Sequence, residues 1–172
     1  LISTVDYYQS GQPCPYANAF WNGTQMVYGA GFPEADDVDA HELTHALTEF
    51  NANLFYYSQS AAMNESYSDI FGETVDLTNT VGTDTAGVRW LMGEEVPGIG
   101  AIRNMLDPTA FGDPGKMRDG QFVCGTSIRS DFGGVHSNSG VPNHAYALMV
   151  DGGSYNGKTV TGIGLTKAGK IQ

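Results

Sequence analysis

The spacing of apolar residues changes from alternation to a helical period near residue 36. Residues 24–28 alternate polar and apolar side chains between two glycine-containing turns, which predicts a short strand at the edge of a sheet. Over 36–50, apolar residues recur at helical spacing, and acidic residues stand at the start, where a helix dipole favours negative charge. The pattern therefore predicts a helix over 36–50.

Three more segments carry a helical pattern. The longest covers about 60–78 and contains no proline, and shorter ones cover 84–92 and 143–150. Residues 1–16 include two prolines, and residues 107–140 are rich in Gly, Asp, Ser and Pro. Because these residue types favour turns, we expect both segments to be loops.

The composition indicates a packed, single-domain protein with an acidic surplus. Of 172 residues, 41% are hydrophobic and 11% are aromatic, which is typical of a globular core. Lys and Arg total 8 against 19 for Asp and Glu. A positively charged face for nucleic acid is hard to build from so few basic residues, so we expect no nucleic-acid partner. No apolar run approaches the ~20 residues of a membrane helix, so we expect no membrane partner.

Glycine content, the chain start and the cysteines point to a secreted protein. The 23 glycines and few lysines suit a loop-rich extracellular chain. The chain begins at Leu1 with no initiator Met and no leader, so we expect a processed or truncated product. Cys14 and Cys124 lack the CxxC spacing of a thiolate metal site, which leaves a disulfide or two free thiols. We expect the disulfide, since thiols oxidise outside the cell.

The motif His41-Glu42-Leu43-Thr44-His45 lies within the first predicted helix. Two imidazoles at positions i and i+4 stand on one helix face and can share a zinc ion. Glu42, about 100° around the helix, is placed to reach a water molecule near that ion rather than to bind it. A lone histidine would more simply be a polar surface residue, but the pair favours a metal site.

A third zinc ligand must come from elsewhere in the chain. A catalytic zinc takes three protein ligands and keeps a fourth position open. The stretch 64–69 on the second predicted helix contains the carboxylates of Glu65 and Asp69. Either position could supply the missing donor.

Several further segments, in this order, resemble the thermolysin family of zinc peptidases. They are residues 18–23 (NAFWNG), 26–29 (MVYG), 64–65 (NE) with 69–72 (DIFG), and 133–136 (GGVH) with 138–140 (NSG). In that family HExxH is followed by Glu after nineteen residues, and residues 46–64 are nineteen. The resemblance covers about 17–170 and implies Glu65 as the third zinc ligand.

The resemblance implies an α+β fold, the zincin core, mainly helical with a short β-rich amino-terminal edge. Residues 1–35 would form the substrate-binding edge and strand, and 36–172 the HExxH helix and a mainly helical lobe. The chain starts where the family's amino-terminal lobe is finishing and stops before its last helices. We therefore expect truncation at both ends, with the flanking lobes or a pro-segment as partners.

The resemblance also implies roles for residues around the metal. Asp69 would orient His41, the usual task of a carboxylate behind a zinc imidazole. Tyr56 and His136 would donate to the developing oxyanion, with Asp131 holding His136. For Tyr56, plain core packing is an equal alternative.

Substrate contacts follow from the same resemblance. Asn18 and the Ala19 backbone would anchor the substrate backbone, and Arg103 would bind a substrate carbonyl, although a surface ion pair is an alternative for Arg103. His144 has no expected role and is placed at the surface. An apolar pocket for a bulky residue after the cut would be lined by Val38, Met92 and Ile102.

Calcium is a second candidate metal. Glu73 and Asp76 share a helical stripe with Glu65, and Asp37 lies one turn before His41. A solvated acidic face is the alternative. This chain has Arg89 at a position where the family usually has an acidic calcium ligand. We therefore do not expect a second calcium ion, and the charge of Arg89 could take the place of the first calcium ion. The expected ligands are Asp37, Glu73, Asp76, Glu94 and the Leu91 carbonyl.

The sequence predicts a zinc endopeptidase that hydrolyses internal peptide bonds of polypeptide substrates. Glu42 would take a proton from water and pass it to the leaving amine. A zinc aminopeptidase is a rival, but no acidic motif for a free amino terminus is found. A non-catalytic zinc-binding fragment or interaction module is the other rival, although a purely structural site would not need Glu42, Tyr56 and His136.

Overall fold

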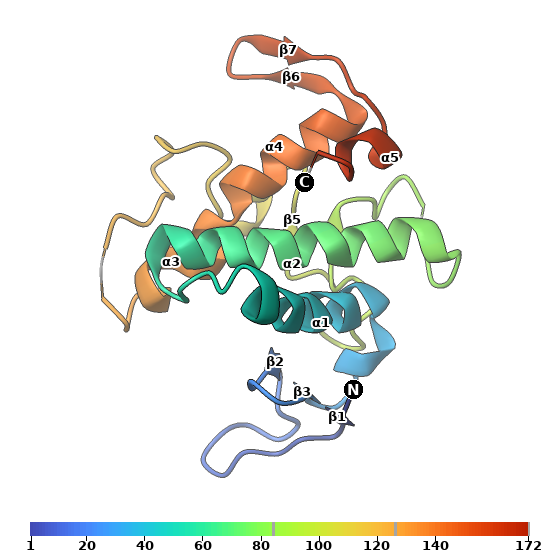
Figure 1. The fold of residues 1–172 in the computed structure, drawn as a ribbon, viewed down its shortest axis with the longest axis vertical. Helices are drawn as coiled ribbons and strands as arrows, with labels where there is room; N and C mark the ends of the chain where they lie inside the picture. The colour runs from blue at the N-terminus through green and yellow to red at the C-terminus, as the bar shows by residue number, and fades with distance from the viewer. Residues whose placement is uncertain (84, 126, 172) are drawn as a thin grey trace.

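Two long helices, α1 (Asp36–Asn51) and α2 (Ser58–Asn79), pack against each other through the middle of the computed structural model (Figure 1). The structure describes residues 1–83, 85–125 and 127–171. A small amino-terminal sheet lies against α1, and α4 (Gly140–Asp151) packs on α2. The order of layers is therefore sheet, α1, α2 and α4.

The first turn of α1 is acidic and lies close to α2. Its first turn contains three acidic residues, which the helix dipole stabilises. A Cβ atom added at Gly72 of α2 would lie 2.6 Å from the Asp37 backbone oxygen. Only glycine at this position allows the two helices to come so near.

The amino-terminal sheet has the strand order β1-β3-β2. The central strand β3 (Met26–Tyr28) is parallel to β1 (Ser3–Thr4) and antiparallel to β2 (Ala19–Trp21). All three residues of β3 are buried, against Phe32, Ala35, Val38 and Val96. The predicted strand over 24–28 exists in shortened form, but it is the middle strand and not an edge.

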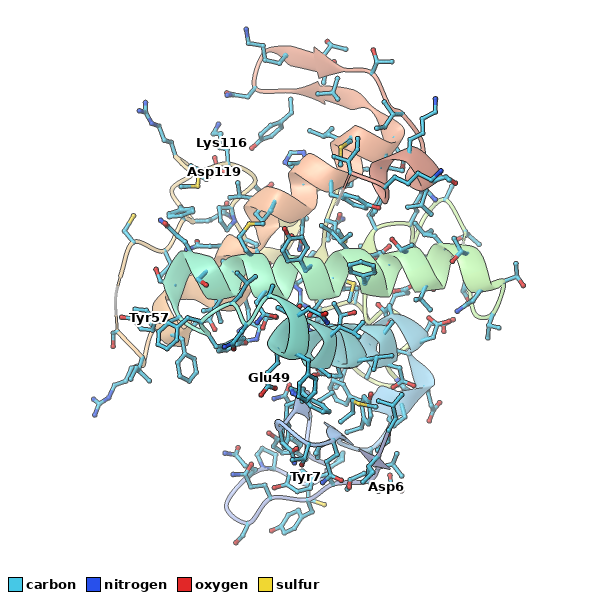
Figure 2. All side chains as sticks on the ribbon, viewed as in Figure 1. Asp6, Tyr7, Glu49, Tyr57, Lys116 and Asp119 are labelled. Carbon is cyan, nitrogen blue, oxygen red and sulfur yellow. The ribbon has the colours of Figure 1, made fainter. Side chains whose placement is uncertain are left out.

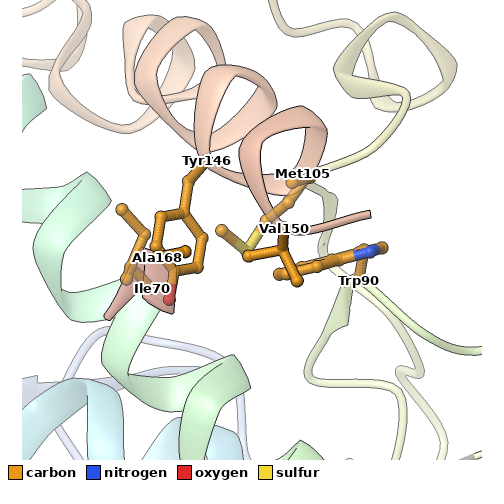
Figure 3. Close-up of a cluster of buried hydrophobic side chains, with 7 residues drawn as sticks. Ile70, Trp90, Met105, Tyr146, Val150 and Ala168 are labelled. Carbon is orange, nitrogen blue, oxygen red and sulfur yellow. The ribbon is translucent and has the colours of Figure 1, made fainter. Parts of the chain in front are cut away.

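A second core fills the space between α2 and α4 (Figure 3). The Trp90 and Tyr146 rings meet edge to face with centroids 6.0 Å apart. Burial of such large side chains contributes most of the stabilisation that hydrophobic packing gives this half of the chain. The buried members are Ile70, Trp90, Met105, Tyr146, Ala147, Val150 and Ala168.

The remaining elements are short and connect these layers. Strands β4 and β5 pair antiparallel, as do β6 and β7, which form the hairpin at the far end from the sheet (Figure 1). The bounds are η1 Phe32–Glu34, β4 Leu91–Met92, β5 Arg103–Asn104, η2 Pro108–Phe111, α3 Asp131–Asn138, β6 Gly153–Tyr155, β7 Lys158–Val160 and α5 Leu165–Ala168.

The α+β class, mostly helical with a small amino-terminal sheet, is confirmed, and so are the helices predicted over 36–50 and 60–78. The helix predicted over 143–150 is longer and begins before Pro142, at Gly140. No described helix is long and apolar enough to cross a membrane.

The loop expected over 1–16 contains the short strand β1, and two further expectations about secondary structure were wrong. Asp84 lies outside the described residues, and 85–92 form turns and β4 instead of a helix, with Trp90 turned into the core. The expected loop over 107–140 contains η2 and α3. In both places tertiary packing overrode the local pattern.

The expected disulfide is also wrong. Cys14 and Cys124 are both free and exposed, and they are not at bonding distance. Cys14 lies in the loop between β1 and β2, whereas Cys124 lies in the segment before α3. The sequence separation of the two cysteines and the expected extracellular location were compatible with a disulfide. Only the fold decides whether the two Cα atoms come within about 7 Å.

Candidate zinc centre and cleft

A cleft of about 700 Å³ opens beside α1 and β2. Its walls come from β2, α1, the 52–57 connection, α2, the β4–β5 pair and α3. The sequence-predicted residues that line it are Asn18, Ala19, Val38, His41, Glu42, His45, Tyr56, Glu65, Met92, Ile102, Arg103 and His136. Residues from six parts of the fold therefore face one space.

His41, His45 and Glu65 bring three metal-ligand atoms together. Their donor atoms all lie within 4.8 Å of one another. The Nε2 atoms of the two histidines are 3.0 Å apart, and Glu65 oxygens lie 3.4 Å from His41 Nε2 and 3.5 Å from His45 Nε2. A tetrahedral zinc with bonds near 2.0–2.1 Å separates its ligand atoms by about 3.3 Å. The three residues therefore fit a zinc ion.

Charge and burial at Glu65 agree with this fit. The side chain is fully buried, and its Oε2 has no hydrogen-bond partner among the described residues. Burial acts to raise the pKa of Glu65, but the charge of His136 and contacts with His41 and His45 outweigh it and hold the pKa well below its usual value. Glu65 is thus an anionic, buried carboxylate with an oxygen directed at no protein donor.

Each zinc-binding histidine is held through its Nδ1 atom. His41 Nδ1 lies 2.8 Å from Asp69 Oδ1. His45 Nδ1 lies 2.9 Å from Asn64 Oδ1 and 3.2 Å from Ser68 Oγ. These contacts set the tautomer in which each Nε2 lone pair faces the metal position. Asn64 and Ser68 were missed in the sequence, although both lie beside Glu65 and Asp69 on the second helix.

Glu42 is buried on α1 next to the ligands. Only 5% of its surface is exposed, and its Oε2 has no hydrogen-bond partner among the described residues. Burial raises the pKa of Glu42 to about 7. A carboxylate with such a pKa can both take and return a proton near neutral pH.

Tyr56 and His136 reach the same space from opposite sides. The Tyr56 hydroxyl donates to Glu65 Oε1 and lies 3.4 Å from His136 Nε2. His136 Nδ1 is 2.6 Å from Asp131 Oδ1. Burial acts to lower the pKa of His136, but the charges of Glu65 and Asp131 outweigh it and raise the pKa. Tyr56 is 40% exposed at the cleft, so core packing does not explain it.

Asp131 begins a left-handed turn that presents His136. Asp131, Phe132, Gly133 and Gly134 have φ values of 53, 48, 92 and 81°. After this turn α3 continues as a right-handed helix that carries His136. Asp131 also accepts from the backbone N–H groups of His136 and Ser137, which fixes the start of the helical part.

Arg103 is only partly exposed, and its ion-pair partner Asp69 is fully buried, so the pair does not lie on the surface. Its Nε and Nη2 atoms donate to the two oxygens of Asp69 at 2.9 and 2.5 Å. The same carboxylate accepts from Asn143 Nδ2 at 2.7 Å. Burial acts to raise the pKa of Asp69, but the charge of Arg103 and contacts with His41 outweigh it and lower the pKa. Asn143 was missed because no local motif marks it.

Two other residues differ from expectation. His144 is buried, with Nδ1 3.2 Å from the Gly115 carbonyl and its ring 4.3 Å from the Tyr155 ring. It was expected at the surface because the sequence does not show that the β6–β7 hairpin folds back over α4. Arg89 pairs with Asp151 at 2.7 Å, so it does not take the place of a cation in the acidic cluster.

Three of the four acidic residues expected to bind calcium are buried and do not form a solvated face. Asp37, Glu73 and Asp76 are each at most 3% exposed. Burial, followed by the charges of Asp37, Asp76 and Glu94, raises the pKa of Glu73 to about 10. Neither Glu73 oxygen has a hydrogen-bond partner among the described residues.

A further contact ties the sheet to α1. Trp21 Nε1 on β2 donates to Glu49 Oε2 on α1 at 2.6 Å. Glu49 is labelled in Figure 2, where it points from α1 towards the sheet. Both residues line the cleft, so this hydrogen bond joins its two walls.

Comparison with known proteins gives two family matches. Residues 1–49 match a family described as thermolysin metallopeptidase, catalytic domain. Residues 52–172 match thermolysin metallopeptidase, alpha-helical domain. Together the two matches cover nearly the whole chain, and the break between them falls at the last two residues of α1.

Individual relatives agree with these matches. A zinc metalloproteinase of Renibacterium salmoninarum is 46% identical over 95% of this chain. Thermolysin of Alicyclobacillus acidocaldarius is 44% identical over 99% of this chain. The chain spans 30% and 31% of the length of these two proteins. The solved precursor of protealysin, a metalloproteinase from Serratia proteamaculans, is 37% identical with a TM-score of 0.65, covering 86% of this chain and 48% of its own.

Proposed function

Because this chain belongs to the thermolysin metallopeptidase family, we propose that it carries the zinc centre and catalytic groups of a secreted endopeptidase. The observation that carries the proposal is the spacing of the His41, His45 and Glu65 donor atoms, which suits tetrahedral zinc. In this proposal residues 1–35 form the substrate-binding edge, and 36–172 supply the metal ligands and catalytic groups.

Proton transfer is the task of Glu42. Bound zinc acts as a Lewis acid and lowers the pKa of water. Glu42 is buried next to the metal ligands and lines the cleft, so its carboxylate is placed to accept a proton from water and later return it to the leaving amine. Its burial beside His41 keeps competing water away from that carboxylate.

Tyr56 and His136 stabilise negative charge on the substrate oxygen. The Tyr56 hydroxyl and His136 Nε2 lie 3.4 Å apart, so a single oxygen atom can meet both donors. Asp131 accepts from His136 Nδ1 and thereby directs Nε2 into the cleft. These two residues act from outside the metal ligand set.

The substrate backbone binds along β2. In the described part of the chain, β2 is the last strand of its sheet, so its outer edge can pair with an extended peptide. Asn18 and Ala19 stand at its start and line the cleft. The guanidinium of Arg103 has donors beyond the two that Asp69 accepts, and these can meet a substrate carbonyl.

A bulky apolar residue after the cut fits the apolar part of the cleft lining. Ile102 is 37% exposed and supplies surface that such a residue would cover. Val38 and Met92 also line the cleft and are buried. We infer that these three side chains set the preference of the enzyme for the substrate residue after the cut.

One calcium ion is the second proposed cofactor. The ligands would be Asp37, Glu73, Asp76, Glu94 and the Leu91 carbonyl. Support comes from Glu73, which is buried without a hydrogen-bond partner among the described residues, and from Glu94 Oε2, which is in the same state. Buried carboxylate oxygens of this kind are stabilised by a hard cation.

Polypeptides are the proposed substrates, and a pro-segment is a second proposed partner. The proposal is supported by the cleft of about 700 Å³ beside the outer edge of β2 and by the similar solved protein, which is titled a precursor. A non-catalytic zinc-binding module is the alternative function. It is disfavoured because Glu42, Tyr56 and His136 all line the cleft beside the metal ligands.

Metal analysis combined with peptide cleavage tests the proposal. The protein should bind one zinc, and Glu65→Ala should lose most of it. Glu42→Gln should keep zinc and fold but lose most of kcat, because an amide cannot accept the proton. Glu34→Gln is the matched control, since Glu34 is exposed and outside the cleft. A Glu42→Gln variant that cleaves like wild type would refute the assignment of the base.

A further inference from the structure

Asn143 on α4 contacts the carboxylate that orients a zinc ligand. Its Nδ2 atom donates to Asp69 Oδ2 at 2.7 Å. Asn143 is 1% exposed and Asp69 is fully buried, so no solvent competes for this hydrogen bond. The two residues are 74 positions apart in the sequence and meet because α4 packs on α2.

Asp69 accepts three hydrogen bonds and lies beside His41. Oδ1 accepts from Arg103 Nη2 at 2.5 Å and lies 2.8 Å from His41 Nδ1. Oδ2 accepts from Arg103 Nε at 2.9 Å and from Asn143 Nδ2. These three hydrogen bonds fix both the position and the plane of the carboxylate that His41 contacts. Loss of Asn143 would leave Oδ2 with Arg103 alone.

The surroundings of Asn143 indicate that this contact is the reason for an amide at the position. Its Oδ1 is buried and has no hydrogen-bond partner among the described residues. An apolar residue of similar size would fill the same space between α2 and α4 without burying an unpaired oxygen. The amide is therefore retained at a cost to stability, and its one strong contact is Asp69.

We propose that Asn143 is a positioning residue for the zinc centre. Acting through Asp69, it holds the His41 ring so that Nε2 faces the metal position, and it makes zinc affinity depend on the docking of α4. This inference rests on the proposed zinc site. A purely structural tie between α2 and α4 would affect fold stability but not the affinity of the folded protein for zinc.

Zinc affinity of the folded protein distinguishes these roles. Asn143→Leu should weaken zinc binding about tenfold, the lower end of the effect of losing a partner behind a metal ligand. Asn143→Ala, which adds no bulk, should give the same loss if the leucine variant does not fold. The measurement is competition with a chelator of known zinc affinity, alongside the thermal midpoint of the metal-free protein.

Asn138→Ala is the matched control. Asn138 is also buried, lies on the neighbouring helix α3, and bonds the Val123 backbone but not Asp69. This variant should lower the thermal midpoint and leave zinc affinity within about twofold of wild type. Equal losses of zinc affinity in the Asn138 and Asn143 variants would overturn the proposal.

A double-mutant cycle with Asp69 shows the route of the effect. In an Asp69→Asn background, replacing Asn143 should change zinc affinity by much less than tenfold, because the carboxylate through which it acts is gone. An undiminished effect would overturn the proposal. If the wild type binds zinc and the Asn143 variants bind it with the same affinity, the inference about Asn143 is overturned but the proposed function is not. If the wild type binds no zinc, the proposed function is overturned as well.

Discussion

Asp131 accepts from both the ring and the backbone of His136, at 2.6 Å from Nδ1 and 2.8 Å from the backbone N. One carboxylate thus sets the direction of the imidazole and the position of the residue that carries it. The left-handed turn that starts at Asp131 makes this double contact possible.

Asp131→Ala should lower the rate of peptide cleavage by about 10- to 100-fold with zinc content unchanged, because His136 loses its orientation. Steady-state kinetics with metal analysis measure both quantities. In a His136→Ala background the same change should add little. A large additional loss in that background would show that Asp131 acts through another group.

Phe132 is a strained residue whose replacement separates stability from activity. Its φ of 48° is unfavourable for phenylalanine but tolerated by asparagine, and its 43% exposed ring contacts Tyr56. Phe132→Asn should be more stable than Phe132→Ala by roughly 0.5–1 kcal/mol, while both lower the cleavage rate through loss of the Tyr56 contact. Urea unfolding and kinetics check the pair, and equal stabilities would contradict the strain.

Calcium should stabilise the wild-type protein through Glu73. In calcium titrations the thermal midpoint should rise for wild type and rise much less for Glu73→Gln. Without calcium, Glu73→Gln should be the more stable of the two, because it removes a buried acid group that must take up a proton to stay buried without partners. Glu95→Gln makes the same charge change next to Glu94 and should respond to calcium like wild type.

Asp113 gives a pH dependence that is separate from the metal sites. Burial raises the pKa of Asp113 to about 6, although the charge of Arg103 and a hydrogen bond from Ser137 act to lower it. The folded state then holds this proton longer than the unfolded state, whose pKa is near 3.8. Its contribution to stability is therefore fully present below about pH 4 and is lost as pH rises to about 6.

Asp113→Asn removes that loss. Between pH 4 and pH 7 the free energy of unfolding should fall less in Asp113→Asn than in wild type. Urea unfolding at the two pH values measures the difference. A parallel change in both proteins would show that Asp113 ionises normally in the folded state.

The candidate metal ligands could be picked out from the sequence because their chemistry is local. His41 and His45 are one helical turn apart, and helical geometry alone brings them to one face. The resemblance to a family then supplied Glu65, which the structure places within reach of both. The roles expected for the surrounding residues remain proposals, although the cleft brings those residues together.

What could not be predicted depends on contacts between distant segments. Asn143 and His144 are adjacent in the sequence, yet one meets Asp69 on α2 and the other meets Gly115 in a loop. Cys14 and Cys124 likewise had a plausible pairing that the fold does not make. Periodicity reports which face of an element is buried, but it does not report what lies opposite.

All three zinc ligands come from two consecutive helices joined by only six residues, 52–57. The loop entropy lost in bringing them together is therefore small. His136 lies 71 residues beyond Glu65 (136 − 65 = 71), so its arrival requires a far longer chain closure. This topology favours an order of folding in which the metal-binding helix pair, with Tyr56 in its connection, forms first and His136 joins it later.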